Sequence, residues 1–242
     1  MITSEMKMAE LIHINYQLLS VLDRFGISLG FGDKKVKEVC SYKDIDTNFF
    51  LEIVNTFNDK DYFPSKSLQN FSVEMIINYL RKTHDYYHEK KVPEIELIID
   101  QLEKGCKEQT NNIKLLRKFF IEYKEELNHH TKKEDNLVFP YASAVEKIYS
   151  GKEINSEEKE VLNKYSMKTF KEEHDNIEEK LYDLKNIIIK YLPPTKKQSI
   201  SIHLLELLFQ LEKDLNDHAR IEDKVMVPKI MEMEKHLSNK MK

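Results

Sequence analysis

Apolar residues recur at alternating steps of three and four over four long stretches of the chain, with charged residues between them. This period is that of a helix with one buried face. Such spacing is typical of the core seam of a helical bundle. We therefore expect an all-α fold, a four-helix up-down bundle. The four stretches span about residues 72–105, 109–149, 155–192 and 195–236.

Local signals mark the ends of these predicted helices. Ser72 is a good N-cap for the first, and Asn155 forms a capping box with Glu158 at the start of the third. Pro93 and Pro140 fall inside the first and second stretches. Proline removes a backbone donor and clashes with the preceding turn, so we expect a bend in each helix there.

A shorter region precedes the bundle and reads as a small helical unit. Its apolar pattern predicts one helix through residues 11–21, ended by Gly26, and two more through residues 36–39 and 49–57. The polar segment at residues 58–67 is a plausible linker. We expect two domains, residues 1–66 (a small helical N-terminal domain with its linker) and residues 67–242 (the bundle).

The composition excludes several classes of partner. Of the 242 residues, 38 are Lys or Arg and 42 are Asp or Glu, without a block of one sign, so nothing indicates nucleic acid. No stretch approaches the roughly 18 apolar residues of a membrane span, and no secretory signal is apparent. Two cysteines, Cys40 and Cys106, are too few for a disulfide framework. Free thiols in the cytoplasm are the expectation.

One motif occurs twice along the chain. His-x3-Glu-Asp, one variable residue, three apolar residues and Pro begins at His130 and again at His218, 88 positions later. A His-Asp pair precedes each copy, at His84 and at His174. The frame is thus duplicated, and each half supplies two imidazoles and one carboxylate.

Each of these residues falls on an apolar stripe, where a leucine would be expected. A carboxylate in an apolar core costs several kcal/mol or becomes neutral unless a cation pairs with it. Residues four apart on a helix share a face, so each His-x3-Glu can bind one cluster. Paired metals held by His and Glu on facing helices are a known arrangement in bundles. The predicted metal ligands are His84, His130, Glu134, His174, His218 and Glu222.

Nitrogen and oxygen ligands without thiolate favour iron or manganese, with zinc possible. If each metal takes two histidines and both glutamates bridge, each has four protein bonds. A water-derived bridge would add a fifth and leave one position for dioxygen, nitric oxide or peroxide. This coordination follows from counting ligands.

Several neighbouring residues have alternative roles. His129 lies about 140° around the helix from Glu134, so His130 is the better candidate, and His129 either lies at the surface or supports a ligand from beside it. His88 and Glu173 are expected beside the ligands, with direct metal contact left open. Core packing is the default for Tyr87 and Tyr123, and a redox or proton-donor role is the alternative. Asp135 and Asp223 either hydrogen-bond ligand imidazoles or face solvent.

At this point the residues resemble a known family. Residues from about 72 to 232 look like the hemerythrin-like domain, and the whole chain resembles the bacterial iron-sulfur cluster repair proteins. The motifs that carry the resemblance are Thr83-His84-Asp85-Tyr86-Tyr87-His88, Val92-Pro93-Glu94, His130-x3-Glu134-Asp135, Phe139-Pro140, Glu173-His174-Asp175, His218-x3-Glu222 and Pro228.

The resemblance implies an oxo-bridged non-haem di-iron centre on the six predicted ligands, with Glu134 and Glu222 as bridges; zinc or manganese is the less favoured content. It also implies repair of clusters damaged by nitric oxide or oxidants, with damaged iron-sulfur proteins as partners. A homodimer is left open. The match includes the segment Asp23-Arg24-Phe25-Gly26-Ile27.

The N-terminal region departs from that family at one place. The family usually carries Cys-Cys-Gly-Gly after the Phe-Gly-Ile segment, whereas this chain has Gly30-Phe31-Gly32-Asp33. Two functions therefore compete: repair by a stress-response protein, and reversible binding or sensing of oxygen or nitric oxide without turnover. Iron storage and structural zinc are weaker readings.

Overall fold

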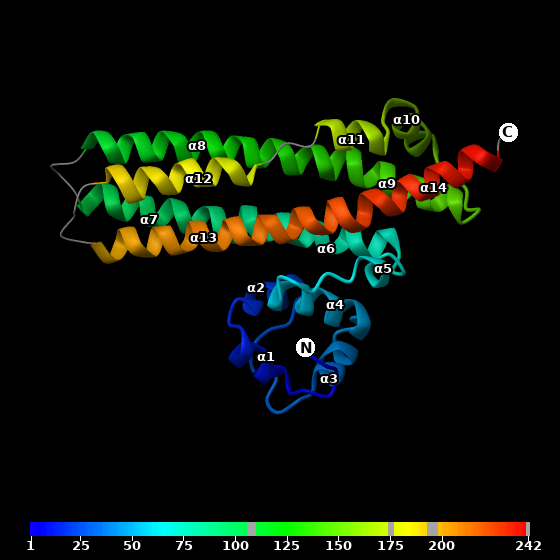
Figure 1. Cartoon of the computed structure of the whole chain (residues 1–242), viewed down its shortest axis with the longest axis horizontal. Coiled ribbons are helices and arrows are strands. Elements are labelled where there is room, and N and C mark those ends of the chain that lie inside the picture. Colours follow the sequence, from blue (N-terminus) through cyan, green and yellow to red (C-terminus); the bar gives the residue numbers. More distant parts are fainter. Residues whose placement is uncertain (106–109, 174–176, 193–197, 241–242) are drawn as a thin grey trace.

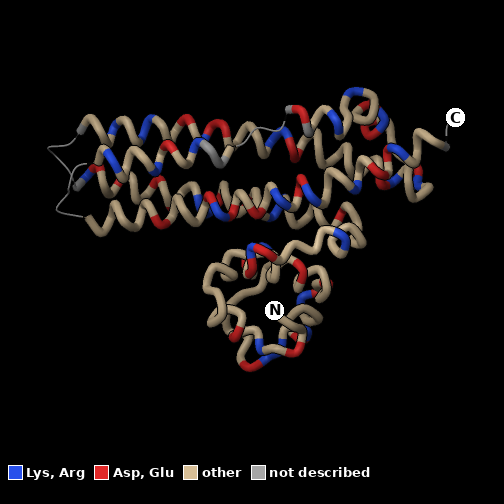
Figure 2. Tube along the Cα trace, viewed as in Figure 1, with Lys and Arg blue, Asp and Glu red and all other residues tan. Residues whose placement is uncertain are grey.

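The computed structural model describes residues 1–105, 110–173, 177–192 and 198–240. These residues form helices and one isolated antiparallel bridge between Lys7 and Lys35. A long bundle lies along one axis, and a compact N-terminal unit, residues 1–58, sits against its side (Figure 1). Basic and acidic residues are interspersed along both parts (Figure 2). No described helix combines the length and apolar character that crossing a membrane requires.

The predicted four-helix up-down bundle is confirmed, and the four limbs run antiparallel in chain order (Figure 1). Neighbouring limbs pack through α7 with α8 and α13, and through α12 with α8 and α13. The limbs are α6 (Val73–Tyr86), η1 (Tyr87–Lys91) and α7 (Val92–Gly105); α8 (Thr110–Lys133), η2 (Glu134–Val138) and α9 (Phe139–Tyr149); α10 (Ser156–Lys164), α11 (Met167–Glu173), α12 (Glu178–Asn186) and η3 (Ile187–Tyr191); and α13 (Gln198–Ile221), η4 (Glu222–Met226) and α14 (Val227–Lys240).

The bends expected at proline take the form of π-helical turns, after which the helix continues. The described residues contain four such turns, and three of them, η1, η2 and η4, end two residues before a proline. A proline has no N–H for the carbonyl four residues back, and its ring needs space that a normal turn does not offer. A turn widened by one residue relieves this conflict. The prolines are Pro93, Pro140 and Pro228.

The third limb is not the continuous helix that the pattern predicts. Helix α10 begins at the expected Asn155–Glu158 capping box and ends at Lys164, because Tyr165 is extended. The Ser166 hydroxyl then accepts a hydrogen bond from the backbone N–H of Thr169 at 3.1 Å and starts α11. A serine that caps a new helix competes with continuation of the previous one.

The N-terminal unit contains two short helices where the pattern predicts one. Helices α1 (Met8–Ile14) and α2 (Leu18–Arg24) are separated because Asn15 is extended and its side chain accepts a bond from the backbone of Gln17. Such Asx turns divert the chain from a helix. The other two predictions are confirmed as α3 (Val36–Tyr42) and α4 (Thr47–Asn58). Gly26 ends α2 with φ of +65°, a conformation that favours glycine.

The linker region contains one short helix, α5 (Ser65–Leu68), and leads directly into the Ser72 cap of α6. As predicted, the Ser72 hydroxyl accepts a hydrogen bond from the backbone of Met75, at 3.2 Å.

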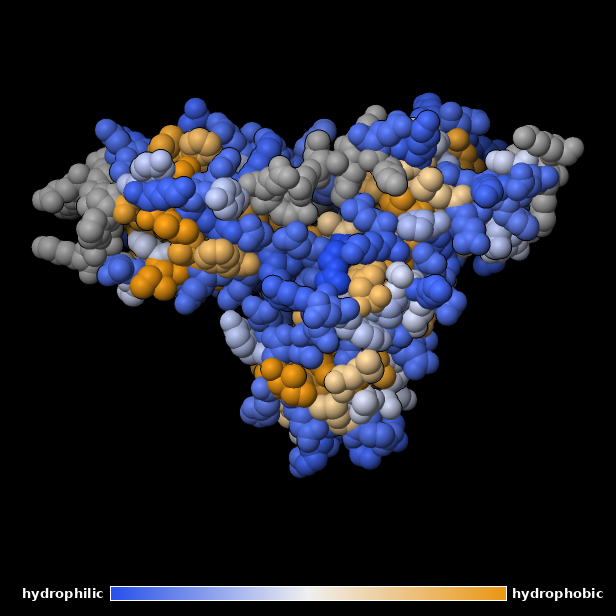
Figure 3. Space-filling view, viewed as in Figure 1, coloured by the Kyte–Doolittle hydropathy of each residue, from blue (hydrophilic) through white to orange (hydrophobic). Residues whose placement is uncertain are grey.

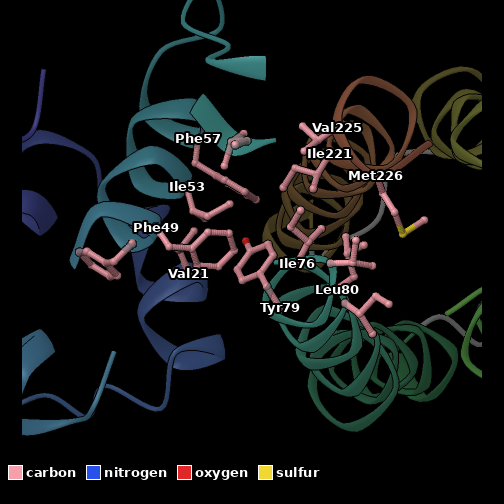
Figure 4. Close-up of a cluster of buried hydrophobic side chains, with 14 of the residues drawn as sticks. Val21, Phe49, Ile53, Phe57, Ile76, Tyr79, Leu80, Ile221, Val225 and Met226 are labelled. Atoms are coloured by element: carbon pink, nitrogen blue, oxygen red, sulfur yellow. The ribbon is translucent and has the colours of Figure 1, made fainter. Parts of the chain in front are cut away.

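Buried apolar residues form two separate cores. The first joins the N-terminal unit to one half of the bundle, which comprises α6, α9, α11, η4 and α14. The second fills the other half, between η1, α7, α8, α12, η3 and α13. Figure 4 shows the junction in the first core, where side chains of α2 and α4 face those of α6, α13 and η4. The two parts therefore share a core.

Phe49 provides a test of this shared core. It is buried on α4, and its ring packs edge-on against Phe71 and Tyr79 with centroids 5.1 and 6.1 Å apart. We expect Phe49→Ala to lower the free energy of unfolding by about 3 kcal/mol or more, because it leaves a cavity where both parts meet. Urea unfolding followed by circular dichroism measures this loss, with Tyr42→Ala, at an exposed position, as the control. A loss no larger than that of the control would contradict a shared core.

Candidate metal centre

A layer of polar side chains separates the two cores at one level of the bundle. Along the first limb, Leu80 belongs to the first core and Tyr87 to the second, and His84 lies between them. The second limb likewise carries Glu134 between Leu127 and Val138. On the fourth limb, the second core ends at Leu215, and His218 and Glu222 follow. The apolar stripes thus continue on both sides of this level.

Four of the predicted ligands converge in this layer. His84, Glu134, His218 and Glu222 are all buried, and each offers one ligand atom within 4.8 Å of the others. The Nε2 atoms of His84 and His218 are 3.3 Å apart. His218 Nε2 lies 3.2 Å from a carboxylate oxygen of Glu222, one turn later on the same limb. The His-x3-Glu spacing therefore places imidazole and carboxylate side by side, as the sequence predicts.

Glu134 faces imidazoles with both of its oxygens. Its Oε2 lies 3.2 Å from His84 Nε2 and 4.0 Å from His218 Nε2, and its Oε1 lies 3.1 Å from His130 Nε2. His130 lies at the rim, with 15% of its side chain exposed, whereas Glu134 is 1% exposed. The Glu134 carboxylate thus lies between His84 and His218 on one side and His130 on the other.

The imidazole of His84 also has contacts at its other ring nitrogen and on its face. Its Nδ1 lies 3.2 Å from a carboxylate oxygen of Asp135, which also approaches Arg81 at 3.8 Å. The ring of Phe139 stacks on it, with centroids 5.5 Å apart and planes 14° apart. A carboxylate on the far nitrogen fixes the orientation of a metal-binding imidazole and raises its basicity. Asp135 therefore performs one of the two roles that the sequence left open.

The pKa of the His84 imidazole reflects the negative charge of the carboxylates around it. Burial opposes protonation of His84, but its contacts with Asp135 and Glu134 outweigh burial and raise its pKa to about 9. The carboxylates thus favour a positive charge at this position. A divalent cation supplies that charge in place of the proton, because metal ligands must be deprotonated.

The remaining candidates are placed as follows. His129 is exposed, as expected of a surface residue. His88 Nε2 lies 2.7 Å from the hydroxyl of Thr131 and is not part of the converging group. Tyr87 and Tyr123 are buried in the second core, and Asp223 is exposed. His174 and the side chain of Glu173 lie outside the described residues.

The donor set fits a metal ion. Buried carboxylates next to imidazoles would otherwise have to be neutralised by protons, and nitrogen with oxygen donors suits iron, manganese or zinc. Sequence reasoning did not find Phe139 as a stacking partner of His84. It also missed Arg24, which is buried under the neighbouring Tyr87. Phe139 lies in the first copy of the repeated motif, just before Pro140, which was a usable signal for it, and the charge of Arg24 gave no signal of its burial.

Comparison with known proteins agrees with this geometry. The family model described as the hemerythrin HHE cation binding domain matches residues 75–230, which include all the candidate ligands. No curated protein matches the chain. From the bundle, the buried His and Glu cluster and this match, we conclude that the chain belongs to the hemerythrin HHE cation-binding family.

Proposed function

We propose that this chain holds a non-haem di-iron centre and acts in the repair of iron-sulfur clusters damaged by nitric oxide or oxidants. The observation that carries the proposal is the buried layer in which two carboxylates and three imidazoles lie between two apolar cores. A cytoplasmic setting and two domains, residues 1–66 and 67–242, belong to the same proposal.

The contacts support a specific division of the ligands. His84 and His218, whose Nε2 atoms are 3.3 Å apart, would hold one iron, and His130 would hold the other. Glu134 would bridge, because its two oxygens face these two sides. His174 is assigned to the second iron on the sequence repeat, and Glu222 is assigned as the other bridge.

Bound iron would supply an open coordination position for nitric oxide, dioxygen or peroxide and the capacity for electron transfer. The protein's own residues provide the surroundings. The two cores exclude water from both sides of the layer, and Asp135 fixes His84 through its far nitrogen. The open rim at His130 is the more accessible side.

A second function is favoured by the N-terminal unit. The usual cysteine pair is replaced by Gly30-Phe31-Gly32-Asp33, and Cys40 is fully buried. Burial raises the pKa of its thiol to about 11. Without that cysteine pair, the centre would bind nitric oxide or dioxygen reversibly, as a sensing module.

Metal content tests the ligand assignment. We expect about two irons per chain in protein purified without added metal. Glu222→Ala or His174→Ala should lose at least one iron, because each removes a proposed ligand. Elemental analysis with the visible spectrum measures this. His203→Ala, at an exposed position on the same limb as Glu222, is the matched control. Full occupancy in both ligand variants would show that the assignment is wrong.

Turnover distinguishes the two functions. If the chain is a repair protein, the iron-loaded form should restore activity to an enzyme whose iron-sulfur cluster was nitrosylated, and Glu222→Ala should not. A relative that retains the cysteine pair serves as the positive control. If only this relative succeeds, and stopped-flow spectra show reversible nitric oxide binding without consumption, the sensing function is correct.

Cys40 provides an independent test of thiol chemistry. The thiolate is the reactive form, and a pKa near 11 leaves little of it at pH 7.5. In a Cys106→Ser background, we expect iodoacetamide to modify Cys40 about a hundredfold or more slower in folded than in urea-unfolded protein. Mass spectrometry measures the rates. Rapid modification of the folded chain would return Cys40 to the candidates for redox chemistry.

A further inference from the structure

Arg24, at the end of α2, carries a full charge in a completely buried position, with 0% of its side chain exposed. It forms an ion pair with Asp214 of α13 and donates an N–H to the Tyr79 hydroxyl at 3.3 Å. Burying an ion pair stabilises a fold no more than well-packed apolar side chains of the same size would. Stability alone therefore gives no reason for this pair at the junction of the two parts.

Aromatic side chains connect Arg24 to the layer of candidate metal ligands. Its guanidinium lies 4.8 Å from the ring centre of Tyr86 and 5.8 Å from that of Tyr87. The Tyr87 ring in turn meets the imidazole of His218 edge-on, with centroids 6.0 Å apart. Tyr87 is fully buried, and its hydroxyl has no hydrogen-bond partner among the described residues. Its contacts with Arg24 and His218 are made through the ring.

Helix α2 is also tied to both ligand-bearing segments by charge. Asp214 lies four residues before His218, one turn away on the same face of α13. Lys90, in the π-turn that follows His84, contacts both carboxylate oxygens of Asp23 at 2.5 and 2.6 Å. The N-terminal unit therefore holds the segments that carry His84 and His218, next to the layer itself.

We propose that Arg24 is a positioning residue that couples the state of the metal centre to the N-terminal unit. A shift of the His218 imidazole on metal binding presses on the Tyr87 ring and moves the turn that carries Asp214, and Arg24 contacts both. The proposal rests on the proposed function, since it requires metal at His84 and His218. Coupling is reciprocal, so loss of Arg24 must also change metal binding.

Hydrogen exchange in the full-length wild-type chain tests the first half of this proposal. The amides of α2, residues 18–24, are compared in metal-free protein and after anaerobic addition of iron(II). We expect slower exchange in the iron-loaded form. Iron bound to His218 restricts the motion of its imidazole, and the packed contacts then restrict the side chains of Tyr87 and Arg24. Helix α3, at the far side of the N-terminal unit from the bundle (Figure 1), serves as the internal control.

Variants test the second half. Arg24→Met removes the charge and keeps most of the volume, and we expect iron(II) affinity at least about fivefold weaker with no iron-dependent change in α2 exchange. Arg24→Lys should restore part of both. Lys185→Met is the matched control: Lys185 is also a buried cation paired with α13, through Glu212, but it joins α12 to α13 within the bundle. Tyr87→Phe should behave as wild type, whereas Tyr87→Leu should behave as Arg24→Met.

The outcomes separate this proposal from the proposed function. If iron binds and α2 exchange is unchanged in the wild type, the coupling is refuted and the metal centre stands. If Lys185→Met weakens iron binding as much as Arg24→Met, the effect is general destabilisation and the coupling is again refuted. If the wild type binds no iron, both proposals fail. Should Arg24→Met not fold, Arg24→Lys and the wild-type exchange measurement decide.

Discussion

The burial of Glu134 and Glu222 at the level where two apolar cores meet is the constraint on which the rest of this structure depends. Their side chains are 1% and 0% exposed. In such surroundings a carboxylate needs a positive partner at short range, because without one it costs several kcal/mol or takes up a proton. Imidazoles from three described limbs lie within hydrogen-bonding distance of these carboxylates, and Asp135 contacts the other ring nitrogen of His84. Apolar packing above and below holds the limbs in register so that these groups meet.

The two copies of the motif share the geometry of their glutamate and the turn that follows it. They differ in the contacts of the surrounding residues. In both copies the glutamate begins a π-turn that ends two residues before a proline. The aspartate that follows differs, because Asp135 reaches His84 whereas Asp223 is exposed. Around the second copy, Arg220 and Lys224 lie over the ring of Phe63 in the linker region. The inner residues form the candidate metal site, and the outer ones differ according to what each limb packs against.

Much of the fold and of the site could be predicted because both depend on periodicity. The spacing of apolar residues determined the four limbs, and the repeated His-x3-Glu placed imidazole and carboxylate on one face. The breaks at Asn15 and Tyr165 were missed because a local side-chain hydrogen bond or an extended residue decides them, and periodicity does not report these. At Pro93 and Pro140 the sequence predicted only a bend, since a proline shows where a helix is strained but not how the strain is relieved.

The contacts of Arg24 could not be predicted for another reason: they join residues far apart in the sequence. Nothing near Arg24 indicates that it will be buried against Asp214, 190 positions later. This contact also bears on how the N-terminal unit works. Its single described cysteine, Cys40, is buried, whereas its charged and aromatic contacts lead to the segments of His84 and His218. Thiol exchange needs an accessible thiolate, and mechanical coupling needs a continuous series of packed side chains. Among the described residues, the N-terminal unit has such a series of packed side chains but no accessible thiolate. Control of the metal centre therefore accounts better for its attachment to the bundle than delivery of a thiol does.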